Sequence, residues 1–344
     1  MHVVILHNLV SPDDSVAVRD VLVQVEVTAR ALETLGYTWD TMTCTLDLAD
    51  LQGRLKRARP DVVFNLVESL GGADWLAPLV PALLDTMDIP YTGCPPEAIL
   101  VTNHKVRAKQ FLRWAGLPTP DWLQSDCLQA FQPDASYVLK SARDHASLGL
   151  DEESLVSAGD AATLAALVAG QAGRIGRPCY AERFVDGREF NVSILTDGAA
   201  PRVLPLAEID FSAFPPGKPR IVGTRAKWEA ASFEFVNTPH RFDLPPDDVP
   251  LLDRIRQLTA DCWRLFALAG YARVDFRVDA QGQPWILEIN ANPCLSPDAG
   301  FAAALTRAAI PFPQAIDRIL HDAVSRVQAH AVPTEGPRSE NGPL

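Results

Sequence analysis

The chain has 344 residues, of which 47% are hydrophobic and 22% charged, and its formal net charge is −12. This composition is typical of a globular protein and excludes a disordered or fibrous one. The acidic balance argues against a general nucleic-acid or membrane-surface binder, so we expect neither partner. No apolar stretch reaches membrane-spanning length, and six dispersed cysteines without a CxxC pair predict reduced thiols in a cytoplasmic protein.

The first hundred residues alternate strand and helix signals, which predicts an α/β unit with a parallel sheet. The amino-terminal run MHVVILHNLV has no basic leader or cleavage site and predicts a first strand. It is followed by an expected helix over 16–35, a strand at 38–44, a short helix and a strand at 61–67. The first loop lacks a GxGxxG fingerprint, so a dinucleotide-binding site has little support.

The run YTGCPP at 91–96 breaks this pattern and indicates a domain boundary. A small α+β unit is expected next, with a helix over 99–116, a strand at 137–140, a helix over 161–171 and a strand at 178–185. A third unit then holds a strand at 188–195, a helix over 249–269, a hairpin at 271–290 and a helix over 312–328. The predicted boundaries are therefore 1–97, 98–185 and 186–330, with a Pro- and Gly-rich tail at 331–344 that we expect to be disordered.

The hairpin YARVDFRVDAQGQPWILEIN is the most informative segment, because it sets acids on facing strands. Charged and apolar residues alternate in its first half, as in a half-buried strand. A two-residue loop at Gln281-Gly282 is the simplest register, and it places Asp275 opposite Glu288 and Arg273 opposite Asn290. Two carboxylates roughly 4 Å apart repel by about 4 kcal/mol at an effective dielectric near 20, so a cation or a proton is needed between them.

Oxygen ligands of this kind suit Mg²⁺ or Mn²⁺, and magnesium is usually held by one or two carboxylates together with substrate phosphates. The hairpin therefore predicts a metal-nucleotide site with Asp275, Glu288 and Asn290 as ligands. A surface hairpin with solvated charges is the alternative. It is weakened because Glu288 and Asn290 lie in a largely apolar run, where a buried acid needs a partner.

Four strings in order carry a family resemblance over residues 60–325: YTGCPPEAILVTNHKVRAKQFLRWAGLPTP, YVLKSARDHASLGL, YAERFVDGREFNVSIL and GYARVDFRVDAQGQPWILEINANPCLSP. Together they resemble the ATP-grasp superfamily, in its D-alanine–D-alanine ligase-like branch. The resemblance implies a three-domain ATP-grasp fold of α/β and α+β units. It also implies a homodimer that uses ATP and two Mg²⁺ ions, with Mn²⁺ as a possible substitute.

The implied reaction is that of an ADP-forming carboxylate-amine ligase acting on amino acids or a small amino-acid-like metabolite. ATP phosphorylates the carboxylate of a first substrate, and the amine of a second attacks the acyl phosphate. A nucleotide-binding protein without turnover is the alternative, against which the retained Arg273 counts. Cys294 could be mistaken for a nucleophile, but it has no identified base partner, so packing is its expected role.

Each site residue takes its expected role from the resemblance. Lys105 and Lys140 would bind phosphates, Glu182 the adenine amino group, backbone groups of Phe184 and Val185 the ring, and Glu189 the ribose. Arg273 would stabilise the tetrahedral oxyanion, Ser147 would belong to a phosphate lid at 142–150, and Lys227 to the loop that covers the acceptor. As alternatives, Lys105 could be a solvated helical lysine, Glu182 could face solvent, and the lid could be an exposed turn.

The departures from the family lie in the substrate regions. Glu68 stands where a histidine is usual, Trp228 where a tyrosine is usual, and Ala299 where a serine helps hold the second substrate's carboxylate. Glu68 is either an anchor for an ammonium group or an exposed loop acid. Asp13, Asp14 and Glu26 are the other candidates for that ammonium, and the sequence does not choose among them.

Overall fold

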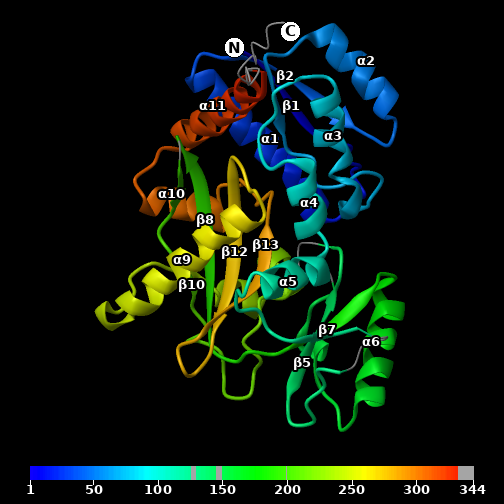
Figure 1. Cartoon of the computed structure of the whole chain (residues 1–344), viewed down its shortest axis with the longest axis vertical. Coiled ribbons are helices and arrows are strands. Elements are labelled where there is room, and N and C mark those ends of the chain that lie inside the picture. The colour runs from blue at the N-terminus through cyan, green and yellow to red at the C-terminus, as the bar shows by residue number, and fades with distance from the viewer. Residues whose placement is uncertain (125–128, 145–148, 199, 332–344) are drawn as a thin grey trace, which may run out of the picture.

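The computed structural model describes residues 1–124, 129–144, 149–198 and 200–331. They form three sheets with helices packed on them, arranged from top to bottom in Figure 1. Ser147 and residues 332–344 of the tail predicted at 331–344 lie outside the described residues, whereas Ala331 ends the last helix. No helix within the described ranges is both long enough and apolar enough to cross a membrane.

The amino-terminal sheet has three parallel strands in the order β2-β1-β3, as the alternating pattern predicted. Its strands are β1 (His2–Asn8), β2 (Thr38–Cys44) and β3 (Val62–Asn65), and its helices are α1 (Val16–Thr34), α2 (Leu48–Ala58), α3 (Leu79–Thr86) and α4 (Pro96–Thr102). One face packs on α2 and α3, and the other packs on α1 and on the carboxy-terminal helices α10 (Gly300–Arg307) and α11 (Phe312–Ala331). In Figure 1, α11 accordingly lies beside α1.

The second sheet has four antiparallel strands in the order β4-β7-β5-β6 and lies at the lower right of Figure 1. Its elements are β4 (Trp122–Leu123), β5 (Ser136–Ser141), β6 (Leu155–Ser157), α6 (Ala161–Ile175) and β7 (Cys179–Arg183). Helix α6 packs its buried stripe on one face of this sheet. The other face is turned toward α5 (Lys105–Trp114).

The third sheet has six strands, in the order β11-β10-β8-β12-β13 with β9 paired to β8. Its elements are β8 (Arg188–Asp197), β9 (Ala200–Val203), β10 (Ala207–Ile209), α7 (Thr224–Trp228), α8 (Phe233–Val236), β11 (His240–Arg241), α9 (Val249–Leu265), β12 (Tyr271–Val278) and β13 (Pro284–Asn290). Helices α9, α4 and α5 cover its apolar face, and α9 crosses in front of β12 in Figure 1. The opposite face is polar and carries the site.

One long helix was predicted over 99–116, and this prediction was wrong. Helix α4 ends at Thr102 and α5 begins at Lys105, because His104 is extended and its ring nitrogen accepts the backbone N–H of Arg107 as an N-cap. The Asn103 side chain donates to the Asp74 carbonyl oxygen, and the Lys105 N–H donates to the Ala142 carbonyl oxygen. These tertiary bonds, which hydrophobic periodicity does not reveal, start α5 at the position where Lys105 reaches the third sheet.

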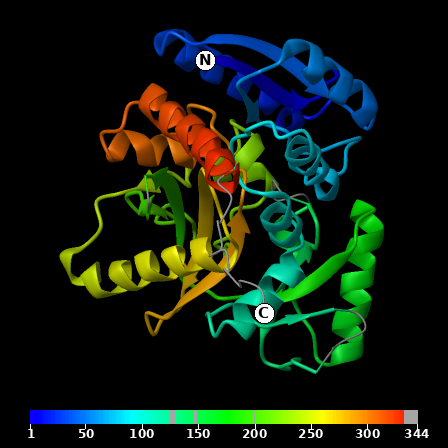
Figure 2. The same cartoon turned by 45° about the horizontal axis from the view of Figure 1, so that its top comes forward.

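The amino-terminal unit is joined tightly to the third sheet at one crossing. The Cys94 thiol lies 3.4 Å from both the carbonyl oxygen and the backbone nitrogen of Ala269. Gly270, with a positive φ, approaches so closely that an added Cβ would lie 3.0 Å from the Gly93 nitrogen. Arg326 of α11 donates to the carbonyl oxygens of Tyr91 and Gly93, which closes the contact. Figure 2 shows these two parts stacked, with the four-stranded sheet to one side.

Gly187, between β7 and β8, gives a test of this architecture. Its φ is +148°, and a methyl group added there would overlap the carbonyl oxygen of Val278. We expect Gly187→Ala to lower the free energy of unfolding by at least about 2 kcal/mol, because it adds both backbone strain and a clash with main chain. Chemical denaturation measures this.

Gly170 is the matched control. It lies on the exposed side of α6 with nothing within 4 Å of an added Cβ. Gly170→Ala should leave stability unchanged or raise it by up to about 1 kcal/mol. Equal effects of the two substitutions would contradict the close approach at Gly187.

Candidate active site

One face of the six-stranded sheet is polar along three neighbouring strands. The rows run across the sheet from β8 through β12 to β13, with Asn191 paired to Asp275 and Asp275 paired to Glu288. Phe190, Val192, Val274, Phe276, Ile286 and Ile289 fill the opposite, apolar face. Since side chains alternate between the faces of a strand, the apolar packing fixes the direction of every charged residue between them.

The predicted facing of Asp275 and Glu288 is confirmed, but the predicted two-residue loop is wrong. Asp279 and Gln283 close a three-residue loop with Gly282 at a positive φ, and this shifts the first part of the ladder by one residue. A β-bulge at Leu287 then restores the shift, because Phe276 pairs with Ile286 while Asp275 pairs with Glu288. The bulge lets Ile286 enter the core while Glu288 still points to the polar face.

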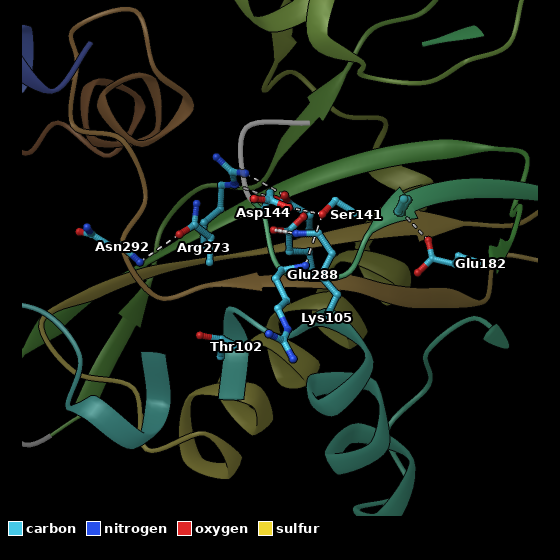
Figure 3. A network of polar contacts seen from close by, with 12 residues as sticks. Thr102, Lys105, Ser141, Asp144, Glu182, Arg273, Glu288 and Asn292 are labelled. Carbon is cyan, nitrogen blue, oxygen red and sulfur yellow. Dashed lines mark hydrogen bonds and ion pairs between the residues drawn. The ribbon is translucent and has the colours of Figure 1, made fainter. Parts of the chain in front are cut away.

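Asp275 is paired with a cation of its own strand. Arg273 binds both of its carboxylate oxygens, with Nε–Oδ1 at 2.7 Å and Nη2–Oδ2 at 2.8 Å, and the Asn191 amide donates to Oδ1 at 2.9 Å. Arg273 faces Asn290 across the ladder, as predicted, and the Asn290 side chain accepts the backbone N–H of Asn292. Arginine, acid and amide thus lie together at one end of the polar face, and Figure 3 shows Arg273 with Asn292 near it.

Glu288 is paired with a cation from a helix. The Lys105 ammonium, only 9% exposed, lies 2.7 Å from Oε1 of Glu288, and Figure 3 shows it reaching across from α5. Lys105 is therefore not the solvated helical lysine of the alternative prediction. Because Lys105 is the first residue of α5, the helix break at His104 is what directs it to Glu288.

Glu182 was expected at the adenine, with solvent as the alternative, and it is buried between two lysines. Lys140 and Lys109 each place Nζ 2.5 Å from one of its carboxylate oxygens. Burial alone would raise the pKa of Glu182, but the two ammonium groups lower it below its usual value.

Lys109 was not among the site residues predicted from the sequence. The available signal was its spacing of four residues from Lys105, which puts both lysines on one face of α5.

The remaining residues expected at the nucleotide are Glu189, Phe184 and Val185, on β8 and on the segment that precedes it. Glu189 of β8 is buried and pairs with Arg277 of β12 at 2.9 Å, yet burial still raises its pKa. The Phe184 ring lies under the Arg277 guanidinium, and the Phe184 N–H donates to the Ser136 carbonyl oxygen. That N–H is therefore already engaged, and Val185 follows directly in the same half-buried irregular segment between β7 and β8.

Lys227 lies on α7, over the polar face. Burial and the neighbouring Arg273 lower its pKa, whereas Glu288 and Asp275 raise it. These four groups therefore act on one another electrostatically, although they come from α7, β12 and β13. Trp228 follows at the end of α7. Ser147, expected in the phosphate lid, lies outside the described residues.

Glu68 lies in a polar cluster between the amino-terminal unit and the third sheet. The buried Gln24 amide donates to Glu68 at 2.9 Å and to Asp20 at 3.3 Å, and the Ser296 hydroxyl donates to both oxygens of Asp20. The Cys294 thiol also lies 3.0 Å from Asp20, so it is a hydrogen-bonded packing residue as expected. Ala299 is the N-cap of α10 and makes no side-chain cap there.

Asp20, the acid that shares the Gln24 amide with Glu68, was not among the three residues predicted from the sequence to bind the ammonium group. Asp14 accepts the backbone N–H of Ser11, Glu26 pairs with exposed Arg30, and Asp13 is exposed, whereas Asp20 points inward from α1. The missed signal is that Asp20, Gln24 and Thr28 recur every four residues, which places them along one side of α1, where Gln24 and Thr28 are buried.

A family model described as D-ala D-ala ligase C-terminus matches residues 112–321, more than half of the chain. The chain belongs to the D-alanine–D-alanine ligase family. This confirms the resemblance, the ATP-grasp fold and the expected class of enzyme, an ATP-dependent, ADP-forming ligase that makes an amide bond.

Individual relatives agree with this membership. The D-alanine–D-alanine ligase of Synechococcus sp. (strain JA-2-3B'a(2-13)) is 28% identical over 87% of this chain and 87% of its own. Protein y4sG of Sinorhizobium fredii, described as uncharacterized, is 29% identical over 84% of each chain. Among solved structures, the D-alanine–D-alanine ligase from Bacillus anthracis complexed with ATP has a TM-score of 0.72 at 19% identity, covering 96% of this chain and 100% of its own.

The oxygens of this polar face fit a divalent metal only in part. Within the residues that the structure describes, no three His, Cys, Asp or Glu side chains gather to hold an ion by themselves. Asp275 and Glu288 are neighbours with hard carboxylate oxygens, and Asn290 adds an amide on the same face. This donor set suits magnesium that takes its remaining ligands from phosphate and water.

Glu68 gives a pH-dependent test of the cluster. Burial raises its pKa from 4.5 to about 7, and Asp20 and Asp74 add to the rise. The folded state therefore keeps a proton between pH 4.5 and 7 that the unfolded chain has lost, so this group's contribution to stability falls as pH rises through that window.

We expect Glu68→Gln to stabilise the fold by on the order of 2 kcal/mol at pH 8 and by much less at pH 5. Urea denaturation at the two pH values measures the difference. A gain of equal size at both would show that the Glu68 carboxyl does not change its protonation in this range.

Proposed function

We propose that the polar face binds Mg-ATP between the four- and six-stranded sheets and joins the carboxylate of one amino acid to the amine of another. The observation that carries this proposal is that each of the four acids expected at the nucleotide and the metal is paired with a lysine or an arginine. From one end to the other these are Glu182 with Lys140, Glu189 with Arg277, Glu288 with Lys105 and Asp275 with Arg273. Such a row suits a ligand that carries both anionic phosphates and cations.

In this proposal Glu182 and backbone groups of Phe184 and Val185 meet adenine, and Glu189 meets the ribose. Lys140 and Lys105 move from their acids to the phosphates, which frees Glu288 to join Asp275 and Asn290 as metal ligands. Two magnesium ions, or manganese in their place, would neutralise and orient the phosphate charge when bound. Ser147 and the loop at 142–150 cover the phosphates and exclude water.

Activation is needed because a free carboxylate has oxide as its leaving group. The terminal phosphoryl group of ATP passes to a carboxylate oxygen of the first substrate, ADP leaves, and the second substrate's amine attacks the acyl carbon. Inorganic phosphate then departs. Arg273 donates to the oxygen that becomes negative in the tetrahedral intermediate, and Lys227, held above it, adds positive charge. Asp275 keeps the guanidinium oriented through two hydrogen bonds.

The substrate end differs from the family, which bears on the product. Glu68, with Asp20 beside it, anchors the ammonium group of an amino-acid substrate, since these carboxylates accept no hydrogen bond from a cationic side chain among the described residues and so favour a cation. Ala299 gives no hydroxyl to a second carboxylate. D-alanyl-D-alanine is therefore one candidate product among several. Separately, the family resemblance suggests that two copies of the chain would form a homodimer.

Glu288→Gln tests the ligase site. We expect it to lower turnover at least about a hundredfold, because it removes a metal-ligand charge, and to lower the thermal midpoint moderately with the fold retained, because the largely buried Lys105 loses its carboxylate partner. ADP release in the presence of D- and L-amino acids measures turnover, and the same panel identifies the substrates.

Glu33→Gln, an exposed change on α1, is the matched control and should keep full activity. Normal turnover in Glu288→Gln would refute the assigned metal site. Tight Mg-ATP binding without ADP release over the whole panel would favour the alternative, a nucleotide-binding protein without ligase turnover.

A further inference from the structure

Lys109 is a buried cation that the proposed reaction does not use. It is 1% exposed and lies in the middle of α5, one turn after Lys105. Its ammonium group pairs with Glu182 at 2.5 Å and donates to the Thr119 hydroxyl at 2.8 Å. Burial lowers its pKa, and Glu182 opposes that change.

Glu182 has two lysine partners of different accessibility. The side chain of Lys140 is 18% exposed and comes from β5, at the base of the predicted phosphate lid, whereas Lys109 is closed off within the protein. Only Lys140 can leave its partner for a ligand without moving α5. If Lys109 were missing, that departure would leave a carboxylate buried with no cation, which is strongly unfavourable.

Resting on the proposed function, we propose that Lys109 is a positioning residue that keeps Glu182 compensated and so allows Lys140 to transfer to the phosphates of ATP. Lys109 touches no substrate in this scheme. It acts through Glu182, and Glu182 acts on Lys140.

The surroundings of Lys109 fix it in place. The Thr119 hydroxyl, which accepts from Lys109, donates in turn to the Ile286 carbonyl oxygen at 2.8 Å, and the Ile286 N–H donates to Pro118. Ile286 immediately precedes the bulge at Leu287 that directs Glu288. Lys109 is thus anchored to the strand that carries the metal ligands, while Lys140 belongs to the sheet on the other side of the nucleotide.

The test compares ATP with adenosine, because only ATP requires the transfer of Lys140. Isothermal titration in the presence of Mg²⁺ should give Lys109→Met a dissociation constant for ATP about tenfold or more above wild type, and less than about threefold for adenosine. Lys109→Arg, which keeps the charge, should recover most of the loss. A merely structural role for Lys109 would weaken both ligands alike and would overturn the proposal.

A double variant sets the control. In Glu182→Gln no buried charge needs compensation, so adding Lys109→Met should change ATP affinity by less than about twofold. A full effect of Lys109→Met in that background overturns the proposal. Should Lys109→Met not fold by circular dichroism, Thr119→Val carries the test, because it releases the Lys109 anchor. It should weaken ATP about threefold more than adenosine, and equal weakening refutes the role.

Wild-type binding separates the two levels of inference. A wild-type protein that does not bind Mg-ATP refutes the proposed function itself. A wild-type protein that binds ATP, with an unchanged ratio of ATP to adenosine affinity in Lys109→Met, refutes only the role of Lys109.

Discussion

The constraint on which the site depends is that a carboxylate buried on a sheet face needs a cation beside it. Removing one partner of a buried pair typically costs about 3–5 kcal/mol, so these acids must be compensated before any ligand arrives. The protein provides the compensation from outside the face for Glu288 and Glu182, through α5, and from within it for Asp275, through Arg273. The cations that stabilise these acids are therefore the same groups that a polyphosphate would attract.

Helix α5 is central to this arrangement. Lys105 and Lys109, one turn apart, point from a single rigid element to an acid of the six-stranded sheet and an acid of the four-stranded sheet. The same helix is anchored at its start to Ala142 and, through Thr119, to Ile286. Ion pairs as well as packing therefore fix the position of the two sheets relative to each other, and both ion pairs come from one ten-residue helix.

Much of the fold could be predicted from local patterns, and the errors have physical causes. The hairpin was predictable because a half-buried strand alternates in sequence, and β1 and β3 were predictable because strands buried on both faces appear as apolar runs. The Asp275–Glu288 pair was predicted correctly from a simpler register. It was correct because two deviations, a longer turn and a bulge, cancel, and neither has a clear sequence signal. The break before α5, Lys109 and Asp20 were missed because each is fixed by contacts between distant segments. The domain boundaries stay a prediction.

The crossing of residues 93–94 with 269–270 decides which parts of the molecule can move against each other. Backbone there approaches backbone with no side chain between, and Arg326 closes the gap, so a sliding motion would break several bonds at once. The amino-terminal unit and the six-stranded sheet are therefore held together by direct backbone contact. The four-stranded sheet is held across the site by ion pairs, by the packing of α5 on Ala142 and Tyr180, and by the Pro118–Thr119 segment. In the proposed function, nucleotide would then enter by motion of the four-stranded sheet, whereas the cluster around Glu68, which links α1 to the segment after β13, would keep its shape.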